Sequence, residues 1–335
     1  MMKLLGGKMS GTLLLKQSEI KNLITMKEVV DAVETAFRAY AQRDVQMPAK
    51  EYLFFNEGDL RIMPCYVRST EEAGVKCVNV HPQNPLEHKL PTVMAVIEMV
   101  DPQTGFPLAV MDGTYVTDMR TGAAAGVATK YLARSDSKVL GIIGAGKQAC
   151  TQLMALNEVM DIEKARVFCR TCSTRTNFAK TASEFYGFDV EAVDTPEIAV
   201  KNADVVVTTT PSRKPLINAD WISPGTHINA MGADAPSKQE LETRLLLKSK
   251  IVIDSWAQAS HSGEINVPVA QKILKRKNIH AKLGDVIVGN ATGREDNEIT
   301  IFDSTGLAVQ DVVTAGMIYR RAREQGVGSE FNFME

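Results

Sequence analysis

The sequence predicts an α/β protein in which a doubly wound parallel sheet is inserted into a second, α+β domain. Three observations predict this fold class. From residue 138 onward, short apolar runs alternate with segments of helical spacing, and a glycine-rich turn joins the first run to the first helix. Residues 51–111 instead carry consecutive strand patterns separated by turn residues. Alternating strands and helices are typical of parallel sheets, whereas consecutive strands indicate antiparallel pairing.

The N-terminal part is expected to combine one helix with antiparallel strands. An apolar run at 12–15 precedes a polar link, and residues 25–28 form a Thr-x-x-Glu capping box that opens a helix. That helix unit ends by Met47-Pro48. A long helix at 112–132, rich in alanine and glycine, follows the strands. The expected strands span residues 52–55, 60–63, 74–80, 92–99 and 106–111.

The second part is expected to form the parallel sheet. Its predicted strands are 139–143, 165–169, 189–193, 204–208, 227–230 and 250–253, and its predicted helices are 148–160, 173–186, 196–201 and 237–246. Because these strands already complete the sheet, a last helix at 306–325 is expected to pack on the first domain. The predicted division places residues 1–130 and 308–335 in one domain and residues 131–307 in the other.

The glycine-rich turn follows the strand expected at 139–143. Gly144, Gly146 and Ala149 form the pattern G-x-G-x-x-A, which between a strand and a helix is the dinucleotide-binding fingerprint of Rossmann folds. The first glycine makes the tight turn, the second lets the pyrophosphate approach, and the alanine lets the helix pack closely. The alternative is a glycine turn that binds nothing. The residues expected around the pyrophosphate are Gly144, Ala145, Gly146, Lys147 and Gln148.

Ligands of open parallel sheets bind at the carboxyl ends of the strands, which selects further candidates. These candidates follow the second, fourth and fifth strands of the parallel sheet. They are Cys169, Arg170 and Thr171 after the second strand, Thr208 and Thr209 at the end of the fourth, and Asn229, Met231 and Asp234 around the end of the fifth.

The residues after the second strand indicate which dinucleotide is bound. NAD sites normally have a carboxylate there for the ribose 2′-hydroxyl, whereas an arginine accommodates a 2′-phosphate. Here Cys169 occupies the acidic position and Arg170 follows it. The sequence therefore predicts NAD(P)(H) as cofactor, with a preference for NADP(H). The alternative is that Arg170 is a solvated surface charge and that either cofactor is used.

Composition excludes several classes of function. The chain of 335 residues has 44% hydrophobic and 23% charged residues, which is normal for a soluble globular protein. Its net charge of −2 gives no reason to expect nucleic acid or an anionic membrane as partner. No apolar run approaches the roughly 20 residues that span a bilayer. The N-terminus lacks the apolar region of a signal peptide, and Met9 is an alternative start that would make residues 1–8 a disordered extension.

The five cysteines favour a reducing, cytoplasmic location, because an odd number in a long chain does not suit a disulfide framework. Cys169 and Cys172 form a C-x-x-C pair whose alternative roles are redox or zinc chemistry, but no second ligand pair lies nearby. The five histidines are dispersed, so no metal site is expected. No serine-hydrolase elbow and no P-loop pattern occurs.

Several charged residues are candidates for catalysis. Asp234 lies among small and apolar residues just past a strand and could act as a general acid or base, or could cap the helix expected from residue 237. Lys76 lies inside an apolar strand, where a lysine is seldom buried without a partner, and its alternative is the solvated face of that strand. Lys50, Arg61 and Arg120 are further cations, whose alternative is exposure to solvent.

Seven stretches, in this order along the chain, resemble the ornithine cyclodeaminase/mu-crystallin family. They are residues 74–79 with His81-Pro82, 90–92, 117–124, 144–149, 232–234, 261–264 and 303–306. The resemblance extends from about residue 12 to the C-terminus, and within the family it is strongest to the archaeal-type alanine dehydrogenase branch. It implies a Rossmann domain inserted into a substrate-binding domain that forms homodimers through its sheet.

The resemblance also implies roles for single residues. Lys76 and Asp234 would be the catalytic pair, and Arg120 would bind the substrate carboxylate. The ribose and nicotinamide would be lined by Thr209, Asn229 and Ser304. The mu-crystallin branch has a similar basic residue followed by threonine after the second strand and uses NADPH.

Two departures from the family's cyclodeaminases bear on the substrate. Lys50 stands where those enzymes have the arginine of a P-x-R motif, and Arg61 stands where they have a glutamate that faces the distal amine of ornithine. A cation there would repel that ammonium by about 1–4 kcal/mol, which favours a short anionic substrate such as pyruvate or alanine. In this scheme Arg61 and Arg120 bind the carboxylate with help from Lys50, Lys76 polarises the carbonyl, and Asp234 shuttles protons.

The function expected from the sequence is therefore that of an NAD(P)-dependent L-amino-acid dehydrogenase, of the alanine dehydrogenase type. An alternative enzyme is an ornithine cyclodeaminase or a reductase of cyclic ketimines. The non-enzymatic alternative is a protein that binds a small ligand with the help of NADPH and does not turn it over.

Overall fold

The computed structural model describes residues 11–295 and 297–334 of the chain. Residues 1–8, for which the sequence suggests an extension, lie outside this part. The chain forms two compact units, each described by itself below. One, the strand-rich unit, comprises Met1–Thr25, Val45–Thr117 and Asp311–Glu335, and the other, the parallel-sheet unit, comprises Met26–Asp44 and Asp118–Gln310.

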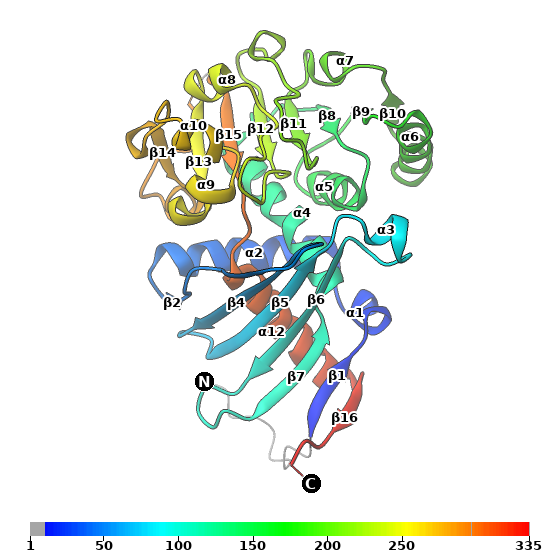
Figure 1. Cartoon of the computed structure of the whole chain (residues 1–335), viewed down its shortest axis with the longest axis vertical. Helices are drawn as coiled ribbons and strands as arrows, with labels where there is room; N and C mark the ends of the chain where they lie inside the picture. The colour runs from blue at the N-terminus through cyan, green and yellow to red at the C-terminus, as the bar shows by residue number, and fades with distance from the viewer. Residues whose placement is uncertain (1–10, 296, 335) are drawn as a thin grey trace. The chain divides into compact units, whose positions relative to one another are not determined.

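The strand-rich unit is built on one sheet, whose order is β16-β1-β7-β6-β5-β4-β2 with β3 beside β4 (Figure 1). Consecutive strands from β4 to β7 pair antiparallel, as predicted. The first strand joins β7 in parallel, which the sequence did not indicate. The strands are β1 (Thr12–Leu15), β2 (Val45–Gln46), β3 (Glu51–Phe54), β4 (Asp59–Val67), β5 (Glu72–Val80), β6 (Val93–Val100), β7 (Pro107–Asp112) and β16 (Ser329–Phe331).

One face of this sheet is covered by the C-terminal helix α12 (Ala308–Gln325). Side chains alternate between the faces along each strand, and in β4 the residues from Arg61 to Val67 alternate between buried and partly exposed. Lys76 and Glu72 of β5 point to the covered face, where they contact Asp311 and Arg320 of α12. The helix therefore places ionic groups directly on the central strand.

The opposite face of the sheet is largely apolar, with Glu98 of β6 between Val75 and Val110, and it is partly exposed within the chain. Its most exposed member is Val96, at 50%. By alternation and register it carries Leu60, Ile62 and Tyr66 of β4, Val75 and Cys77 of β5, Met94 and Val96 of β6, and Leu108 and Val110 of β7. We call these residues the open face.

Two expectations for the N-terminal part need correction. Residues 17–23, predicted as part of a polar link, form helix α1 (Gln17–Leu23), because Ile20 and Leu23 are spaced to bury one side of a helical turn. A short helix, α3 (Asn84–Glu87), lies in the predicted turn after β5. The predicted helices at 26–41 and 112–132 are confirmed as α2 (Met26–Ala41) and α4 (Gly113–Leu132).

The parallel-sheet unit contains a second eight-stranded sheet, of order β10-β9-β8-β11-β12-β15-β13-β14. Every neighbouring pair is parallel, which confirms the predicted doubly wound, Rossmann-type sheet. The strands are β8 (Val139–Ile143), β9 (Lys164–Phe168), β10 (Asp189–Ala192), β11 (Val205–Thr208), β12 (His227–Ala230), β13 (Lys250–Ile253), β14 (Ile279–Lys282) and β15 (Thr300–Asp303).

The sheet is not complete without the last strands, contrary to the expectation from the sequence. β15 lies between β12 and β13, and β14 forms the edge beyond β13. All four residues of β15 are buried, since helices or strands cover it on every side. A short apolar run shows that a strand can form but does not show where it inserts, because its partners are distant in sequence.

Seven helices of this unit lie between residues 147 and 287. They are α5 (Lys147–Asn157), α6 (Cys172–Tyr186), α7 (Pro196–Val200), α8 (Thr243–Leu247), α9 (Trp256–Ser262), α10 (Asn266–Ala270) and α11 (Leu283–Ile287), with short 3-10 turns η1 (Ala219–Trp221) and η2 (Arg276–Asn278). The predicted helix at 237–246 is wrong for its first six residues. Side chains of buried residues hold that segment as a loop through its backbone N–H groups.

The boundary between the two compact units falls inside long helices. It lies between Thr117 and Asp118 within α4 and between Gln310 and Asp311 within α12, and α2 belongs to the parallel-sheet unit. The division that the sequence suggests, with residues 131–307 as the inserted domain, stays a prediction.

Candidate functional site

The glycine turn between β8 and α5 has the geometry that a phosphate-binding turn needs. Gly144 has φ +110°, and a Cβ at this position would lie 2.4 Å from Thr209 Oγ1. Only glycine suits such a backbone. A Cβ at Gly146 would meet no atom within 4 Å, so the space beside this residue is open. Ala149 is fully buried against the sheet, and the open side of the turn is left for a ligand.

A cavity of about 750 Å³ lies along this turn, within the parallel-sheet unit. It brings together seven of the residues predicted to bind the cofactor: Gly144, Ala145, Gly146, Cys169, Arg170, Thr171 and Thr209. The remaining wall is formed by residues 210–214 and Leu216, with Ile143, Phe168 and Thr174. The cavity therefore follows the carboxyl ends of β8, β9 and β11, where ligands of such sheets bind.

The charged residues that line this cavity are all cations. Arg170, Arg213 and Lys214 line it and are exposed, and no aspartate or glutamate is among the lining residues. Among the described residues, no carboxylate forms an ion pair with any of the three. They are therefore available to an anionic group, and Arg170 lies at the position that the sequence connects with a 2′-phosphate.

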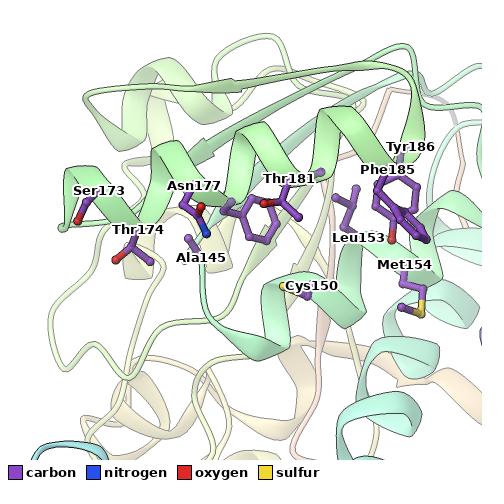
Figure 2. A pocket seen from close by; sticks show the side chains of 12 residues that line it. Ala145, Cys150, Leu153, Met154, Ser173, Thr174, Asn177, Thr181, Phe185 and Tyr186 are labelled. Carbon is purple, nitrogen blue, oxygen red and sulfur yellow. The ribbon is translucent and has the colours of Figure 1, made fainter. Parts of the chain in front are cut away.

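A second, apolar groove of about 600 Å³ lies between α5 and α6 and shares Ala145 and Thr174 with the cavity. Figure 2 shows Ser173 and Thr174 at one end of this groove and Phe185 with Tyr186 at the other. Burial raises the pKa of Tyr186 to about 12, so its phenol is neutral. The groove offers packing surface and no charged side chain, unlike the cavity beside the glycine turn.

Two predicted cofactor residues on α5 contact an aspartate that the sequence analysis did not single out. Lys147 Nζ lies 3.6 Å from Asp118 Oδ2, and Gln148 donates a hydrogen bond of 3.1 Å to Asp118 Oδ1. Burial raises the pKa of Asp118, although Lys147 opposes this effect. Asp118 belongs to the motif at 117–124, so its presence in a quoted motif was the available signal.

The other predicted cofactor residues are buried at the ends of their strands. Asn229 donates to Thr129 Oγ1 at 2.9 Å and pairs with His227 at 3.2 Å, so its side chain is already bonded inside the unit. Ser304 donates its backbone N–H to Ala230. A role for these residues at a cofactor stays a prediction, as it does for Thr208 and Met231, which are also buried.

Asp234 lies in the loop after β12 and is ion-paired with Lys238. Its side chain is 33% exposed, whereas that of Lys238 is 16% exposed. The alternative role as the cap of a helix from residue 237 is wrong, because α8 begins only at Thr243. The carboxylate is thus partly accessible and ion-paired with Lys238, and its role in proton transfer stays a prediction.

Buried carboxylates hold the loops that carry these residues. Glu240 accepts hydrogen bonds from the backbone N–H groups of Thr210, at 2.7 Å, and Gly232, at 3.0 Å. Glu264 accepts from the N–H of Glu240 at 2.9 Å, and Asp303 accepts from that of Glu264, also at 2.9 Å. This series fixes the loops after β11, β12 and α9. The sequence does not reveal the series, because most of the donors are backbone groups, which have no sequence signature.

Burial raises the pKa of each carboxyl group in this series. For Asp303 the loss of solvent, together with the nearby charge of Asp254, raises the pKa to about 8, although two backbone N–H bonds oppose the rise. Burial also raises the pKa of Glu240 and Glu264, and in Glu264 the charge of Glu240 adds to the effect. Burial therefore favours the neutral form of each of these carboxyl groups.

Arg120, which was predicted to bind a carboxylate, lies on α4 within the parallel-sheet unit. It is 7% exposed, and its Nη1 donates to Gln310 Oε1 at 3.1 Å. Gln310 Oε1 also accepts the backbone N–H of Leu307, at 3.1 Å. The guanidinium is thereby fixed beside the loop that follows β15.

In the strand-rich unit, the predicted catalytic lysine forms a buried ion pair. Lys76 Nζ lies 2.6 Å from Asp311 Oδ1, and both side chains are 0% exposed. A lysine inside an apolar strand is seldom buried without a partner, and Asp311 is the partner here. The alternative of a solvated lysine is wrong. The role of Lys76 in catalysis stays a prediction.

Arg61 is also paired, and this pairing weakens the argument about the substrate. Its Nε lies 2.7 Å from Asp59 Oδ1 and its Nη2 lies 3.3 Å from Asp59 Oδ2, in a two-point contact. The guanidinium is 5.5 Å from the ring centre of Tyr52, on the adjacent strand β3. Asp59 offsets the charge of Arg61, so the repulsion of a distal ammonium is smaller than expected from Arg61 alone. Lys50 is partly exposed just before β3.

Metal and membrane sites find no support in the described part of the chain. In residues 11–295 and 297–334, no group of three or more histidine, cysteine or acidic side chains could hold a metal ion. None of the described helices is both long enough and apolar enough to cross a membrane. All five cysteines are free thiols.

Comparison with known proteins adds the family. Residues 10–326 match the ornithine cyclodeaminase/mu-crystallin family. An alanine dehydrogenase of Archaeoglobus fulgidus is 50% identical over 327 residues, which cover 96% of this chain and 98% of that protein.

Solved structures with the same fold carry nicotinamide cofactors. An archaeal alanine dehydrogenase dimer with bound NAD is 50% identical, with a TM-score of 0.93 over 96% of this chain and 99% of that one. A Thermococcus litoralis Δ1-pyrroline-2-carboxylate reductase, in complex with NADH and L-proline, is 41% identical, with a TM-score of 0.93 over 96% and 100% of the two chains.

Proposed function

Because the chain belongs to the ornithine cyclodeaminase/mu-crystallin family, we propose that it is an alanine dehydrogenase that interconverts L-alanine with pyruvate and ammonia. The chain is an NAD(P)-dependent oxidoreductase that acts on amino-acid-like substrates, and the identity of the substrate is the proposed part. The observation that carries the proposal is the 50% identity to an archaeal alanine dehydrogenase over nearly the whole of both chains.

The cofactor site fits a dinucleotide, because the wall beside Gly146 is open and the cavity follows three strand ends. The turn from Gly144 to Lys147, at the N-terminus of α5, would hold the pyrophosphate. Bound NAD(P)H supplies the hydride that reduces the substrate carbon. We propose a preference for NADP(H), supported by three exposed cations and the absence of a lining carboxylate. NAD or NADH is the cofactor in the two related structures, which argues for the opposite preference.

The residues of this chain would divide the remaining work. Arg61 and Arg120, with Lys50 assisting, would bind the substrate carboxylate. Lys76 would hold its ammonium against the carbonyl oxygen and stabilise the negative charge that develops there. Asp234 would take a proton as ammonia adds to the carbonyl carbon and return one as water leaves. The oxo acid, ammonium, one proton and one hydride then become the amino acid and one water.

A second candidate is a Δ1-pyrroline-2-carboxylate reductase, which reduces a cyclic imine. Two observations favour it. Asp59 offsets the charge of Arg61, which weakens the argument from that charge for a short substrate. A reductase of this kind is 41% identical to the chain. The cyclic imine needs no ammonia, so the two candidates make different demands in an assay.

We further propose a homodimer formed through the open face of the strand-rich unit, in a reducing, cytoplasmic setting. Apolar patches of this kind on a sheet are typical of interaction surfaces. The related archaeal structure is a dimer. All five cysteines are unpaired, which supports the setting.

The direct test is a panel of substrates with NADH and with NADPH. It contains 2-oxo acids with ammonia, the cyclic imine without ammonia, and ornithine. The proposal predicts ammonia-dependent oxidation of the cofactor with pyruvate, faster with NADPH. Faster oxidation with the cyclic imine would favour the second candidate. Conversion of ornithine with no net change in the cofactor would indicate a cyclodeaminase. Tight cofactor binding without turnover of any substrate would contradict the enzymatic proposals.

A further inference from the structure

Asp311 forms an ion pair with the ammonium of Lys76, and neither side chain has exposed surface. The two residues come from different elements, Lys76 from the middle of β5 and Asp311 from the first turn of α12. They are 235 positions apart in sequence. The contact is therefore a product of the fold, made where the C-terminal helix crosses the central strand.

A lysine in this position needs a partner for its geometry as well as its charge. Its four-carbon stem is flexible and its ammonium is a compact point charge. A carboxylate at 2.6 Å restricts the ammonium to one place and compensates for the loss of water.

We infer that Asp311 is a positioning residue, which holds the Lys76 ammonium where it meets the substrate carbonyl oxygen. The inference rests on the proposed function, because it takes Lys76 as the group that touches the substrate. Asp311 does not touch the substrate and exchanges no proton in this scheme. Its contribution is to keep the Lys76 ammonium in place throughout the reaction. The alternative is a purely structural role, in which the ion pair only attaches α12 to the sheet.

The same strand and helix provide a matched control. Glu72 lies on the same face of β5 and is ion-paired with Arg320 of α12. Its side chain is 8% exposed, and this second pair also joins the sheet to the helix. Glu72→Gln therefore removes a carboxylate of comparable structural value without touching Lys76. A merely structural role would give both substitutions similar effects on activity.

The test compares Asp311→Asn, Asp311→Glu, Lys76→Met and the double variant Lys76→Met/Asp311→Asn, all in the full-length enzyme. The control is Glu72→Gln. The measurements are kcat, KM for the substrate, the dissociation constant of NAD(P)H, and the thermal midpoint. Displacement of a reacting group by about 1 Å can cost on the order of 100-fold in rate. We expect Asp311→Asn to lower kcat by roughly 10- to 100-fold with cofactor binding unchanged within about twofold. Asp311→Glu should recover part of the loss, and Glu72→Gln should change kcat by less than about threefold.

The double variant gives the sharpest readout. Residues that act as a unit have non-additive effects, so Asp311→Asn should change kcat by less than about twofold once Lys76 is methionine. Additive losses, or equal losses from Glu72→Gln and Asp311→Asn, would overturn the inference. If Asp311→Asn does not fold, Asp311→Glu decides, since a lower kcat with an unchanged thermal midpoint supports positioning and an unchanged kcat refutes it. A wild-type protein inactive on the whole substrate panel would refute the proposed function and the inference together, whereas an active wild type with additive variants would refute the inference alone.

Discussion

The two units of the molecule differ in how their candidate site cations are paired and exposed. In the strand-rich unit, Lys76 and Arg61 are each ion-paired with a carboxylate and are almost completely buried. In the parallel-sheet unit, Arg170, Arg213 and Lys214 line the cavity, are exposed and, among the described residues, have no carboxylate in ion-pair contact. A paired cation is held in place before a substrate arrives. An unpaired cation can form its ion pair with an incoming phosphate.

This difference predicts how removal of a cation affects the free energy of unfolding in each unit. Removing one partner of a buried pair leaves an uncompensated charge and is strongly destabilising, typically by about 3–5 kcal/mol. Removing an exposed cation costs the fold little and affects mainly the ligand that it meets. Substitutions of Lys76 and Arg61 should therefore change catalysis and stability together, and those of the three cavity cations should change ligand affinity alone.

The largest effect is expected from Lys76→Met. Methionine fills a similar volume but cannot stabilise charge on the carbonyl oxygen, so we expect kcat to fall by about 100- to 1000-fold. It also leaves Asp311 without its cation, so the thermal midpoint should fall as well. Steady-state kinetics with pyruvate, ammonia and NADPH measures the first effect and calorimetry the second. A kcat within a few-fold of wild type would contradict the catalytic role of Lys76, because Lys76 would then be structural.

Two alanine substitutions in the glycine turn should separate folding from binding. Gly146→Ala adds a methyl group into open space, so the free protein should keep its stability while NAD(P)H binding weakens by about 10-fold or more. Gly144→Ala forces an L-residue to φ +110° and places its Cβ near Thr209, so it should destabilise the free protein by about 1–3 kcal/mol. Cofactor fluorescence titration and chemical denaturation distinguish them. Equal loss of stability in both variants would show that the space beside Gly146 is not a ligand site.

A smaller effect is expected from Arg170→Ser, which removes an unpaired cation from the cavity. Loss of one charge-assisted contact should weaken NADPH binding by about 10-fold, because such bonds contribute about 1.5–3 kcal/mol. NADH binding should change by less than about twofold. Titration with both cofactors gives the ratio of affinities, with Arg166→Ser as a control on the preceding strand β9, where Arg166 donates to backbone carbonyls instead. An equal loss for both cofactors would mean that Arg170 does not meet the 2′-phosphate.

The smallest effect is the contribution of Asp303 to the pH dependence of stability. Its folded pKa of about 8 lies above its usual value of 3.8, so the native protein holds a proton that the unfolded chain has released. Stability from this group is full below the usual value and is lost as pH rises through about 8. Glu240 and Glu264 act in the same direction. Between about pH 6.5 and 8, we expect Asp303→Asn to flatten the decline by about 1 kcal/mol per pH unit. An unchanged slope in denaturation experiments would show that Asp303 is ionised in the native state.

The parts of the molecule that the sequence predicts well are those whose signals are local. The turn at Gly144 and Gly146 has its strand, its helix and its chemistry within a few residues. The antiparallel strands before it follow one another in the chain, so their pairing is also local. The residues of the cavity could be predicted because strand ends of a parallel sheet meet at one edge.

What the sequence does not show is pairing between distant residues. Lys76 was a candidate, but Asp311 was not, because nothing in the first turn of α12 indicates which strand it will meet. The pairing of Arg61 with Asp59 is closer in sequence, yet alternation alone did not reveal it and the charge of Arg61 was overestimated. The insertion of β15 between β12 and β13 depends on the same long-range contacts.

In the proposed reaction, this chain transfers a hydride to the carbonyl carbon of a 2-oxo acid as ammonia replaces the carbonyl oxygen. The most direct measurement uses pyruvate, isotopically labelled ammonia and NADPH deuterated at its transferable position, with mass spectrometry of the product. The expected product is L-alanine that carries the labelled nitrogen and one deuterium on Cα, formed in the same amount as the cofactor is oxidised. Oxidation without such alanine, or no oxidation with any 2-oxo acid and ammonia, would contradict the proposed reaction.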